Sequence, residues 1–328
     1  MAGLDILFLG GTGVISTASV RLAVERGHRV TVLNRGRSAS TRSVPEEVEQ
    51  LVGDVADPVS VDEAVGDREF DVVAQFRAFT TDTVQGDVDR FRGRVGQYVF
   101  ISSASAYQKP PASIPVTEST PLKNPFWQYS RDKIACEDLL VREDRDRDFP
   151  MTIVRPSHTY DDTLLPTMGG WTDIARMRAG KPVVVHGDGT TPWTLTHSDD
   201  FAVGFVGLLG RPEALGNAYT ITGESAPTWN QVYTWLGRAA GVEPDLVHVP
   251  SERIAREVPD LGPGLVGDKA HAMLFDTTKL RRLVPEFTTT VPYAEGARRQ
   301  IAWYDAHPGA QRVDEELDAA FDRLAALA

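Results

Sequence analysis

The sequence predicts an α/β protein built on a doubly wound parallel β-sheet. Short apolar runs typical of buried strands alternate with stretches of helical spacing, which is the pattern of a parallel sheet. A glycine-rich turn at 10–13 separates the first apolar run, 6–9, from the first helical stretch, 16–24. We therefore expect a single sheet whose first strand ends in a glycine turn.

The glycine turn stands where a dinucleotide would bind. A glycine-rich turn indicates a dinucleotide site when it lies between a strand and a helix, as it does here. Gly10 permits a tight turn, Gly13 lets the backbone approach a pyrophosphate, and the helix N-terminus supplies free N–H groups. Ser16 replaces the usual third glycine and is still small. The contacts predicted here are Gly10, Thr12, Gly13, Val14 and Ile15.

The end of the second strand, 29–33, bears on which dinucleotide binds. An acidic residue at position 34 would hold the ribose 2′-hydroxyl of NAD. The chain has Asn34 there, followed by Arg35 and Arg37, which can accept the 2′-phosphate of NADP. The alternative is that the two arginines contact only solvent on an exposed loop and bind no cofactor. NAD and NADP therefore both stay open.

A tyrosine and a lysine stand four residues apart at the start of a later predicted helix. Tyr129 and Lys133 share one face of that helix. A lysine ammonium beside a phenol favours the phenolate and lowers the tyrosine pKa. Tyr129 is therefore predicted to be a general acid or base for a substrate hydroxyl.

Composition narrows the class of protein. The 328 residues carry a net charge of −12, which argues against nucleic-acid or anionic-membrane partners. The one cysteine, Cys136, excludes an intrachain disulfide and fits a reducing compartment. No apolar run approaches the roughly 18 residues of a membrane span, and no signal-like N-terminus is visible. We expect a cytoplasmic protein without a metal site.

Further motifs continue along most of the chain: Gly53-Asp54, the stretch 102–107, Glu118 with Pro121, Arg155-Pro156, 197–200 and 276–279. With the glycine turn and the Tyr129–Lys133 pair, they resemble those of the extended short-chain dehydrogenase/reductases, the NAD-dependent epimerase/dehydratase family. The resemblance implies a Rossmann domain over 1–160, to which 195–222 return. It implies a substrate lobe made of 161–194 and 223–328.

The resemblance also implies roles for individual side chains. Ser103 would hydrogen-bond the reacting oxygen, Tyr129 would exchange its proton, and Lys133 would hold the nicotinamide ribose. The remaining predicted cofactor contacts are Asn34, Arg35, Asp54, Val55, Gln75, Lys133 and Pro156. The predicted substrate contacts are Arg77, Ser105, Trp127, His158 and Trp193.

The segment after the fourth strand, 71–75, is shorter than the family pattern. It reaches the fifth strand by residue 97 and holds no asparagine between 83 and 95 to support the lysine. This shortening resembles the branch with the chloroplast stem-loop-binding proteins, which bind RNA. The acidic charge and the intact Tyr129–Lys133 pair weigh against that role. Because the same helix often builds the family's dimer interface, a homodimer stays open.

Two positions at which the family's nucleotide-sugar enzymes carry diphosphate-binding arginines differ here. The first of these positions is Trp193. At the second, just before Gly267, the chain has Leu265 and Val266. An indole cannot replace a bidentate guanidinium–phosphate contact. We therefore expect a substrate without a diphosphate, an uncharged nucleoside or small sugar derivative. Trp193, Trp127 or Trp171 can stack on its ring or simply pack in the core.

The resemblance implies transient oxidation of a sugar hydroxyl, with more than one net outcome. Ala104-Ser105 stands where dehydratases have an Asp-Glu pair, which favours epimerisation. His158 stands where the family often has asparagine and is either an extra acid–base group or a positioning residue. Dehydration, NADPH-dependent reduction and a non-enzymatic RNA- or ligand-binding role are the alternatives.

Overall fold

The computed structural model describes residues 3–36 and 42–327. Its centre is a seven-stranded, wholly parallel sheet in the order β10-β6-β5-β4-β1-β2-β3. The strands are β1 (Asp5–Leu9), β2 (Arg29–Asn34), β3 (Glu49–Val52), β4 (Phe70–Gln75), β5 (Val95–Ile101), β6 (Met151–Pro156) and β10 (Asn217–Ile221). The direction of winding reverses between β1 and β4, where α/β sheets bind their ligands. The predicted fold class is confirmed.

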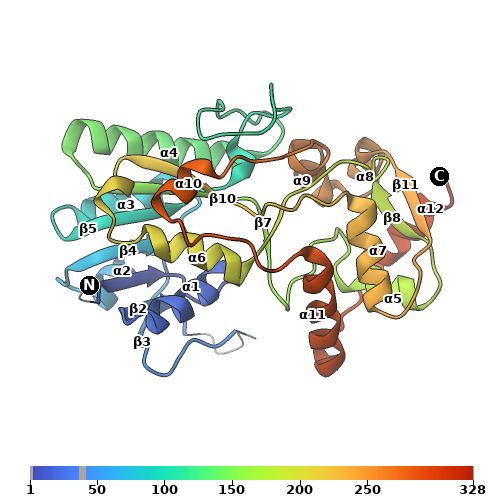
Figure 1. Cartoon of the computed structure of the whole chain (residues 1–328), viewed down its shortest axis with the longest axis horizontal. Coiled ribbons are helices and arrows are strands. Elements are labelled where there is room, and N and C mark those ends of the chain that lie inside the picture. The colour runs from blue at the N-terminus through green and yellow to red at the C-terminus, as the bar shows by residue number, and fades with distance from the viewer. Residues whose placement is uncertain (1–2, 37–41, 328) are drawn as a thin grey trace.

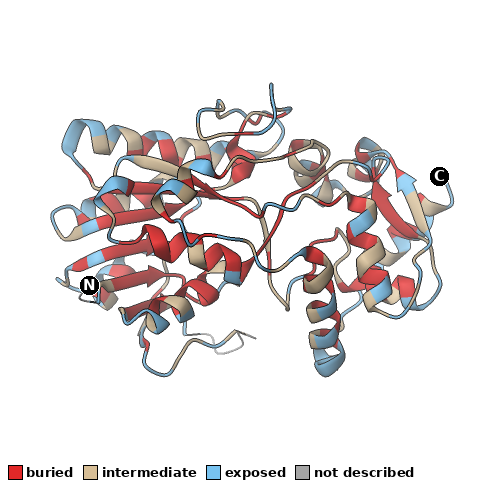
Figure 2. Ribbon diagram, in the orientation of Figure 1, coloured by how far each residue is buried: buried red, intermediate tan, exposed pale blue. Residues whose placement is uncertain are grey.

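Helices cover both faces of this sheet (Figure 1). One face carries α1 (Val14–Glu25) and α6 (Ser198–Leu208), which pack together. The other carries α2 (Pro58–Val65), α3 (Thr81–Phe91) and α4 (Gln128–Arg147). Strand side chains alternate between the two faces, so Phe8 packs with α1 and α6 while Leu7 packs with α3 and α4. Buried residues accordingly concentrate along the strands and inner helix faces (Figure 2).

A second lobe lies beyond the carboxyl ends of the strands (Figure 1). Its elements are α5 (Trp171–Arg178), β8 (Val183–His186), α7 (Trp229–Ala239), β11 (Leu246–Val249), α8 (Ser251–Glu257), α9 (Gly262–Gly264), α11 (Tyr293–Ala306) and α12 (Glu315–Ala325). It has a core of its own, rich in aromatic side chains from α5, α7 and α11. A short parallel pair, β7 (His158–Tyr160) with β9 (Leu195–His197), stands apart from the main sheet.

One segment of the expected second lobe packs elsewhere. Helix α10 (Thr278–Leu283) contacts α6 and β10 of the sheet domain. Leu280, Val284 and Phe287 join the core under α1 and α6. Their spacing of four and three residues makes one apolar stripe, which explains why this segment is drawn to the sheet domain. The lobe boundaries themselves stay a prediction.

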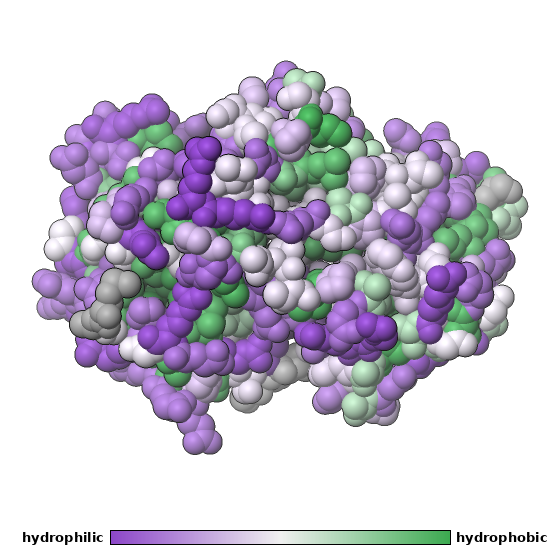
Figure 3. Space-filling view, in the orientation of Figure 1, coloured by the Kyte–Doolittle hydropathy of each residue, from purple (hydrophilic) through white to green (hydrophobic). Residues whose placement is uncertain are grey.

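The face in Figure 3 is mostly hydrophilic, with hydrophobic residues in scattered groups. Within 3–36 and 42–327, no helix is both long and apolar enough to cross a membrane.

Candidate active site

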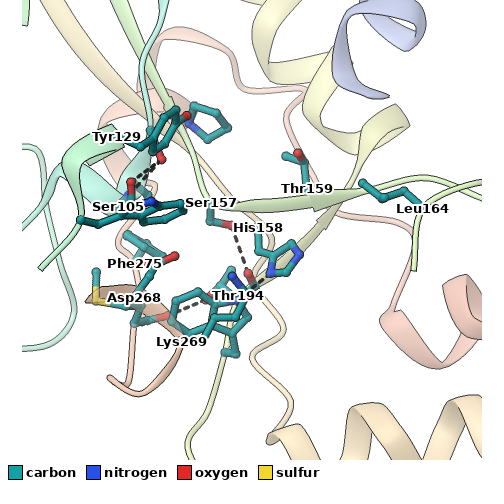
Figure 4. A pocket seen from close by; sticks show the side chains of 16 residues that line it. Ser105, Tyr129, Ser157, His158, Thr159, Leu164, Thr194, Asp268, Lys269 and Phe275 are labelled. Carbon is teal, nitrogen blue, oxygen red and sulfur yellow. Dashed lines mark hydrogen bonds between the residues drawn. The ribbon is translucent and has the colours of Figure 1, made fainter. Parts of the chain in front are cut away.

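Two cavities meet at the carboxyl ends of the strands. The first, here called the glycine-turn cavity, has about 250 Å³ and lies against the loop between β1 and α1. The second, the lobe cavity, has about 340 Å³ and is lined partly by the second lobe (Figure 4). The residues common to both walls are Ser103, Tyr129, Pro156, Ser157 and Thr159. Ligands in the two cavities would therefore meet at Tyr129 and Ser103.

The glycine turn has the backbone conformation that a dinucleotide requires. Gly10 adopts a φ of +92°, and a Cβ there would lie 2.1 Å from Cγ of Arg77. The Gly11 amide donates to Oδ1 of Asn34 at 3.1 Å, which fixes the turn to the end of β2. Gly13 is the N-cap of α1, whose 12 residues direct a positive dipole end at the cavity. The residues present thus fit a dinucleotide phosphate.

Arg77 lies on the wall of the glycine-turn cavity and is not among the residues that line the lobe cavity. Its guanidinium lies 5.3 Å from the ring centroid of Phe79. Its backbone N–H donates to Oε1 of Gln75 at 2.7 Å, which turns the chain toward Gly10 directly after β4. Arg77 thus lies at the glycine-turn cavity, and its contact with the substrate stays a prediction. Its charge lies next to the turn that would hold the cofactor phosphates.

The predicted cofactor contacts fall into two groups. Gly10, Gly13, Val14, Ile15, Lys133 and Pro156 line the glycine-turn cavity. Thr12, Asn34, Arg35, Asp54, Val55 and Gln75 do not line it. Arg35 is exposed beyond β2, and Arg37 falls outside the described residues.

Gln75 is fully buried and acts within the protein. Its Nε2 donates to Oδ2 of Asp87 on α3 at 2.5 Å, and the Tyr98 hydroxyl donates to the same oxygen at 2.8 Å. Burial raises the pKa of Asp87 to about 6, against the lowering effect of these bonds. Gln75 therefore positions the turn that carries Arg77, and its contact with the cofactor stays a prediction.

Tyr129 stands in the first turn of α4 with its phenol at the shared wall. Burial raises its pKa, and a hydrogen bond with Ser103 opposes the rise. Ser103 and Ser105 hydroxyls lie 2.9 Å apart, and Ser130 donates to Ser105 at 2.8 Å. This serine chain holds Ser103 in place beside the phenol.

The pKa of Tyr129 is raised mainly by burial, so a lowering by Lys133, expected from the sequence, does not dominate. The Lys133 ammonium is buried and donates to the carbonyl oxygens of Ala78 at 2.7 Å and Ile101 at 2.8 Å. It lies 5.8 Å from the Tyr129 ring centroid. Burial lowers the pKa of Lys133 to about 8. The family pattern has an asparagine that supports this lysine, which is absent here between 83 and 95. The carbonyl oxygen of Ala78, on the short connection before α3, accepts from the lysine ammonium.

The lobe cavity is walled by His158 and Trp193 on the side away from Tyr129. Nε1 of Trp193 donates to Nδ1 of His158 at 3.2 Å, and the indole stacks on Trp229 with centroids 5.9 Å apart. Burial, helped by the charge of Lys269, lowers the pKa of His158 to about 3. His158 is therefore neutral near pH 7 and carries its proton on Nε2. This favours the positioning alternative over an acid–base role.

The other two tryptophans considered as ligand contacts differ in where they lie. Trp127 lines the lobe cavity, and its ring centroid lies 5.0 Å from that of Tyr129. Trp171 does not line it, and stacks on Tyr304 in the second-lobe core with centroids 4.8 Å apart. Trp171 is thus unavailable to a ligand there, which corrects that possibility. Cys136 is buried under the sheet, where burial raises its pKa to about 11, as expected of a packing residue.

A family model described as the NAD dependent epimerase/dehydratase family matches residues 6–222. The chain belongs to this family. The resemblance read from the motifs is therefore confirmed, and the site described above is that of an extended short-chain dehydrogenase/reductase.

The similar proteins span more than one activity. The chain is 28% identical over 255 residues to chloroplast stem-loop binding protein of 41 kDa b of Arabidopsis thaliana, covering 74% of this chain but only 65% of that protein. It is 27% identical to 2′-dehydrokanamycin reductase of Streptomyces kanamyceticus, covering 87% of this chain and 80% of that one. The solved structure of epimerase Mth375 from Methanothermobacter thermautotrophicus has a TM-score of 0.78 at 17% identity, covering 95% of each chain.

Sequence reasoning missed the charged residues of the lobe cavity. Asp268 and Lys269 line this cavity. The buried Lys109 pairs with Asp268, with Nζ and Oδ1 2.9 Å apart. In the epimerase/dehydratase family the stretch before Gly267 is where an arginine is expected. The lysine lies two residues after Gly267, outside the stretch in which the family pattern places that arginine.

The segment that carries these residues is attached to the start of α4. Nδ2 of Asn124 donates to the carbonyl oxygen of Gly267 at 2.7 Å. A Cβ on Gly267 would lie 3.1 Å from both Phe126 and Trp127, so the two stretches are in close contact. The lobe cavity is therefore closed on this side by direct packing.

Proposed function

We propose that this protein transfers hydride between a nicotinamide cofactor and a hydroxyl-bearing carbon of a small sugar or nucleoside that lacks a diphosphate. Epimerisation is the net reaction we favour. The observation that carries the proposal is the wall shared by the two cavities, where Tyr129 and Ser103 face both. Membership of the family supports an enzyme that uses NAD or NADP.

The chain's own residues supply the proton chemistry. A bound nicotinamide would supply the hydride acceptor and donor. Ser103 holds the substrate oxygen, and Tyr129 takes the hydroxyl proton as the C–H hydride leaves, so that an alcohol becomes a ketone. Lys133 uses two of its three N–H donors on Ala78 and Ile101. The third is left for the cofactor ribose.

The lobe cavity supports a substrate without a diphosphate. No arginine stands among the described residues that line it, and Trp193 occupies one of the expected arginine positions. Arg176, a conceivable replacement, is buried instead against Asp318 and Asp322 of α12. A diphosphate carries two charges, and a phosphate charge without a partner would be costly to bury there.

Uridine and glucose are expected to stabilise the protein in the presence of cofactor, while UDP-glucose, GDP-mannose and dTDP-glucose give no larger shift. Thermal unfolding with matched ligand concentrations measures this. Turnover of a diphosphate sugar would contradict this part of the proposal.

Net reduction is the second candidate, because the relative that covers 87% of this chain is a reductase. The two reactions differ in cofactor balance. An epimerase converts substrate with no net change in absorbance at 340 nm, whereas a reductase consumes NADPH in step with product. Mass spectrometry of small molecules released from the denatured protein identifies the resident cofactor and points to the substrate. Dehydration stays an alternative, but neutral His158 is no ready second acid, so the site favours it less than the other two reactions.

Arg35→Ala tests the 2′-phosphate. If Arg35 pairs with it, the variant should bind NADP about 10-fold more weakly and NAD equally well, because a charged hydrogen bond is worth about 1.5–3 kcal/mol and this one is exposed. Titration of both cofactors against both proteins measures this. Equal weakening for both would show that Arg35 contacts the adenosine or shapes the loop.

A further inference from the structure

Lys269 is a positive charge at the lobe cavity that the reaction described so far does not use. It ends the short π-helical turn Leu265–Lys269 that follows α9. Its carbonyl oxygen accepts from Nε1 of Trp229 at 3.4 Å, which fixes the backbone to the second-lobe core. Its side chain is partly buried and belongs to the lining of the cavity, beside Asp268 (Figure 4).

The neighbouring carboxylate, Asp268, attracts Lys269 but is already paired with a second lysine. Oδ1 of Asp268 lies 2.9 Å from Nζ of Lys109, whose side chain is 0% exposed. Lys109 and Asp268 therefore form a buried pair of zero net charge. Across 3–36 and 42–327, Lys269 has no hydrogen-bond or ion-pair partner for its ammonium.

The remaining titratable groups near Lys269 carry no negative charge. Its charge reaches the imidazoles of His158 and His186, whose pKa values are lowered to about 3 and about 4, mainly by burial. Both rings are therefore neutral near pH 7. The Trp193 indole, which closes that side, has its N–H directed to His158. With Lys109 and Asp268 paired, the groups around the cavity leave one uncompensated positive charge.

We propose that Lys269 binds a single anionic group of the substrate, a carboxylate or a phosphate monoester. This rests on the proposed function and names the substrate class of the same cavity. It departs from the sequence-based expectation of an uncharged ligand. A lysine ammonium is a compact point charge that suits one anionic group, whereas diphosphates are typically gripped by planar arginine forks.

The unpaired charge also gives a physical reason for selectivity. An isolated buried cation is costly unless it is paired, so an anionic ligand relieves a cost that is present in the empty cavity. Burial lowers the pKa of Lys269; the charge of Asp268 opposes this lowering and the charge of Lys109 adds to it. A neutral sugar cannot relieve that cost, which makes the cavity discriminate between ligands of similar size.

The test compares three matched pairs of probes in the presence of cofactor: glucose with glucose 6-phosphate, glucose with glucuronate, and uridine with uridine monophosphate. Calorimetric titration should show about 10- to 100-fold tighter binding for the anionic member of at least one pair, the range expected of a charged hydrogen bond. The glucuronate and phosphate arms distinguish the two anions. If no anionic probe binds more tightly than its neutral partner to the wild type, the proposal is wrong.

Three variants assign the selectivity to this residue. Lys269→Met should remove the preference, while Lys123→Met, the same change at an exposed lysine, should keep it. Asp268→Asn leaves Lys109 unpaired and should strengthen anion binding, a direction that partial unfolding does not produce. A full preference retained in Lys269→Met would overturn the assignment.

Binding and turnover fail separately. The same titrations in Tyr129→Phe need no chemistry, so an inactive protein can still show the anion preference. If turnover depends on Tyr129 but anionic probes bind no more tightly than neutral ones, the role of Lys269 is refuted and the proposed function is not. UDP-glucose bound through Lys269 would support the anion site and contradict the diphosphate-free substrate of the proposed function.

Discussion

Tyr129→Phe is expected to lower kcat by about 10²- to 10⁴-fold while cofactor affinity stays unchanged, because general acid–base catalysis contributes about that much. The phenol stands at the wall shared by both cavities and is hydrogen-bonded to Ser103. Removing one oxygen leaves the ring packed beside Trp127 and Phe79. The loss should therefore fall on proton transfer. Steady-state rates and cofactor titration on both proteins measure it.

Tyr219→Phe is the matched control. Tyr219 lies on β10, away from both cavities, and donates to the Glu213 carbonyl oxygen at 3.2 Å. Its loss should cost about 1 kcal/mol of stability, as for one net hydrogen bond, and leave kcat unchanged. A Tyr129→Phe enzyme with wild-type turnover would rule out the proposed proton transfer.

The sheet could be predicted because its signals are local. A parallel strand buried on both faces is a continuous apolar run, as at β1, and the glycine turn that follows it is marked by residues required for its backbone shape. The packing of α10 was missed for the opposite reason. The apolar stripe of Leu280, Val284 and Phe287 can be recognised in the sequence. The neighbouring residues do not indicate whether it packs in the core of the sheet domain or in that of the second lobe.

The site was predictable in residue type and less so in side-chain direction. Arg77 follows β4, and its direction toward Gly10 depends on the bond from its own amide to the side chain of Gln75. Lys133 shares a helix face with Tyr129, yet its ammonium donates to two carbonyl oxygens that are distant in sequence. One is that of Ala78, between β4 and α3, and the other is that of Ile101, at the end of β5. Unpaired carbonyls of this kind leave no trace in a sequence pattern.

Arg155→Met is expected to reduce the free energy of unfolding by about 3–5 kcal/mol, because it leaves a buried carboxylate without its partner. Arg155 on β6 donates to Glu137 of α4 through Nε at 3.0 Å and Nη2 at 2.5 Å. Its Nη1 donates to the Tyr107 hydroxyl at 3.1 Å. The Glu137 side chain is 2% exposed, so water cannot replace the guanidinium. Urea unfolding measures the change.

Two further variants separate the loss of an ion pair from the loss of packing. Arg147→Met breaks an exposed pair with Glu143 and should cost less than about 1 kcal/mol. Glu137→Leu combined with Arg155→Met removes both buried charges and should recover much of the stability lost by Arg155→Met alone. An Arg155→Met protein no less stable than Arg147→Met would contradict the prediction. A double variant no better than the single would show that Arg155 acts through packing and Tyr107, and that the charge of Glu137 matters little.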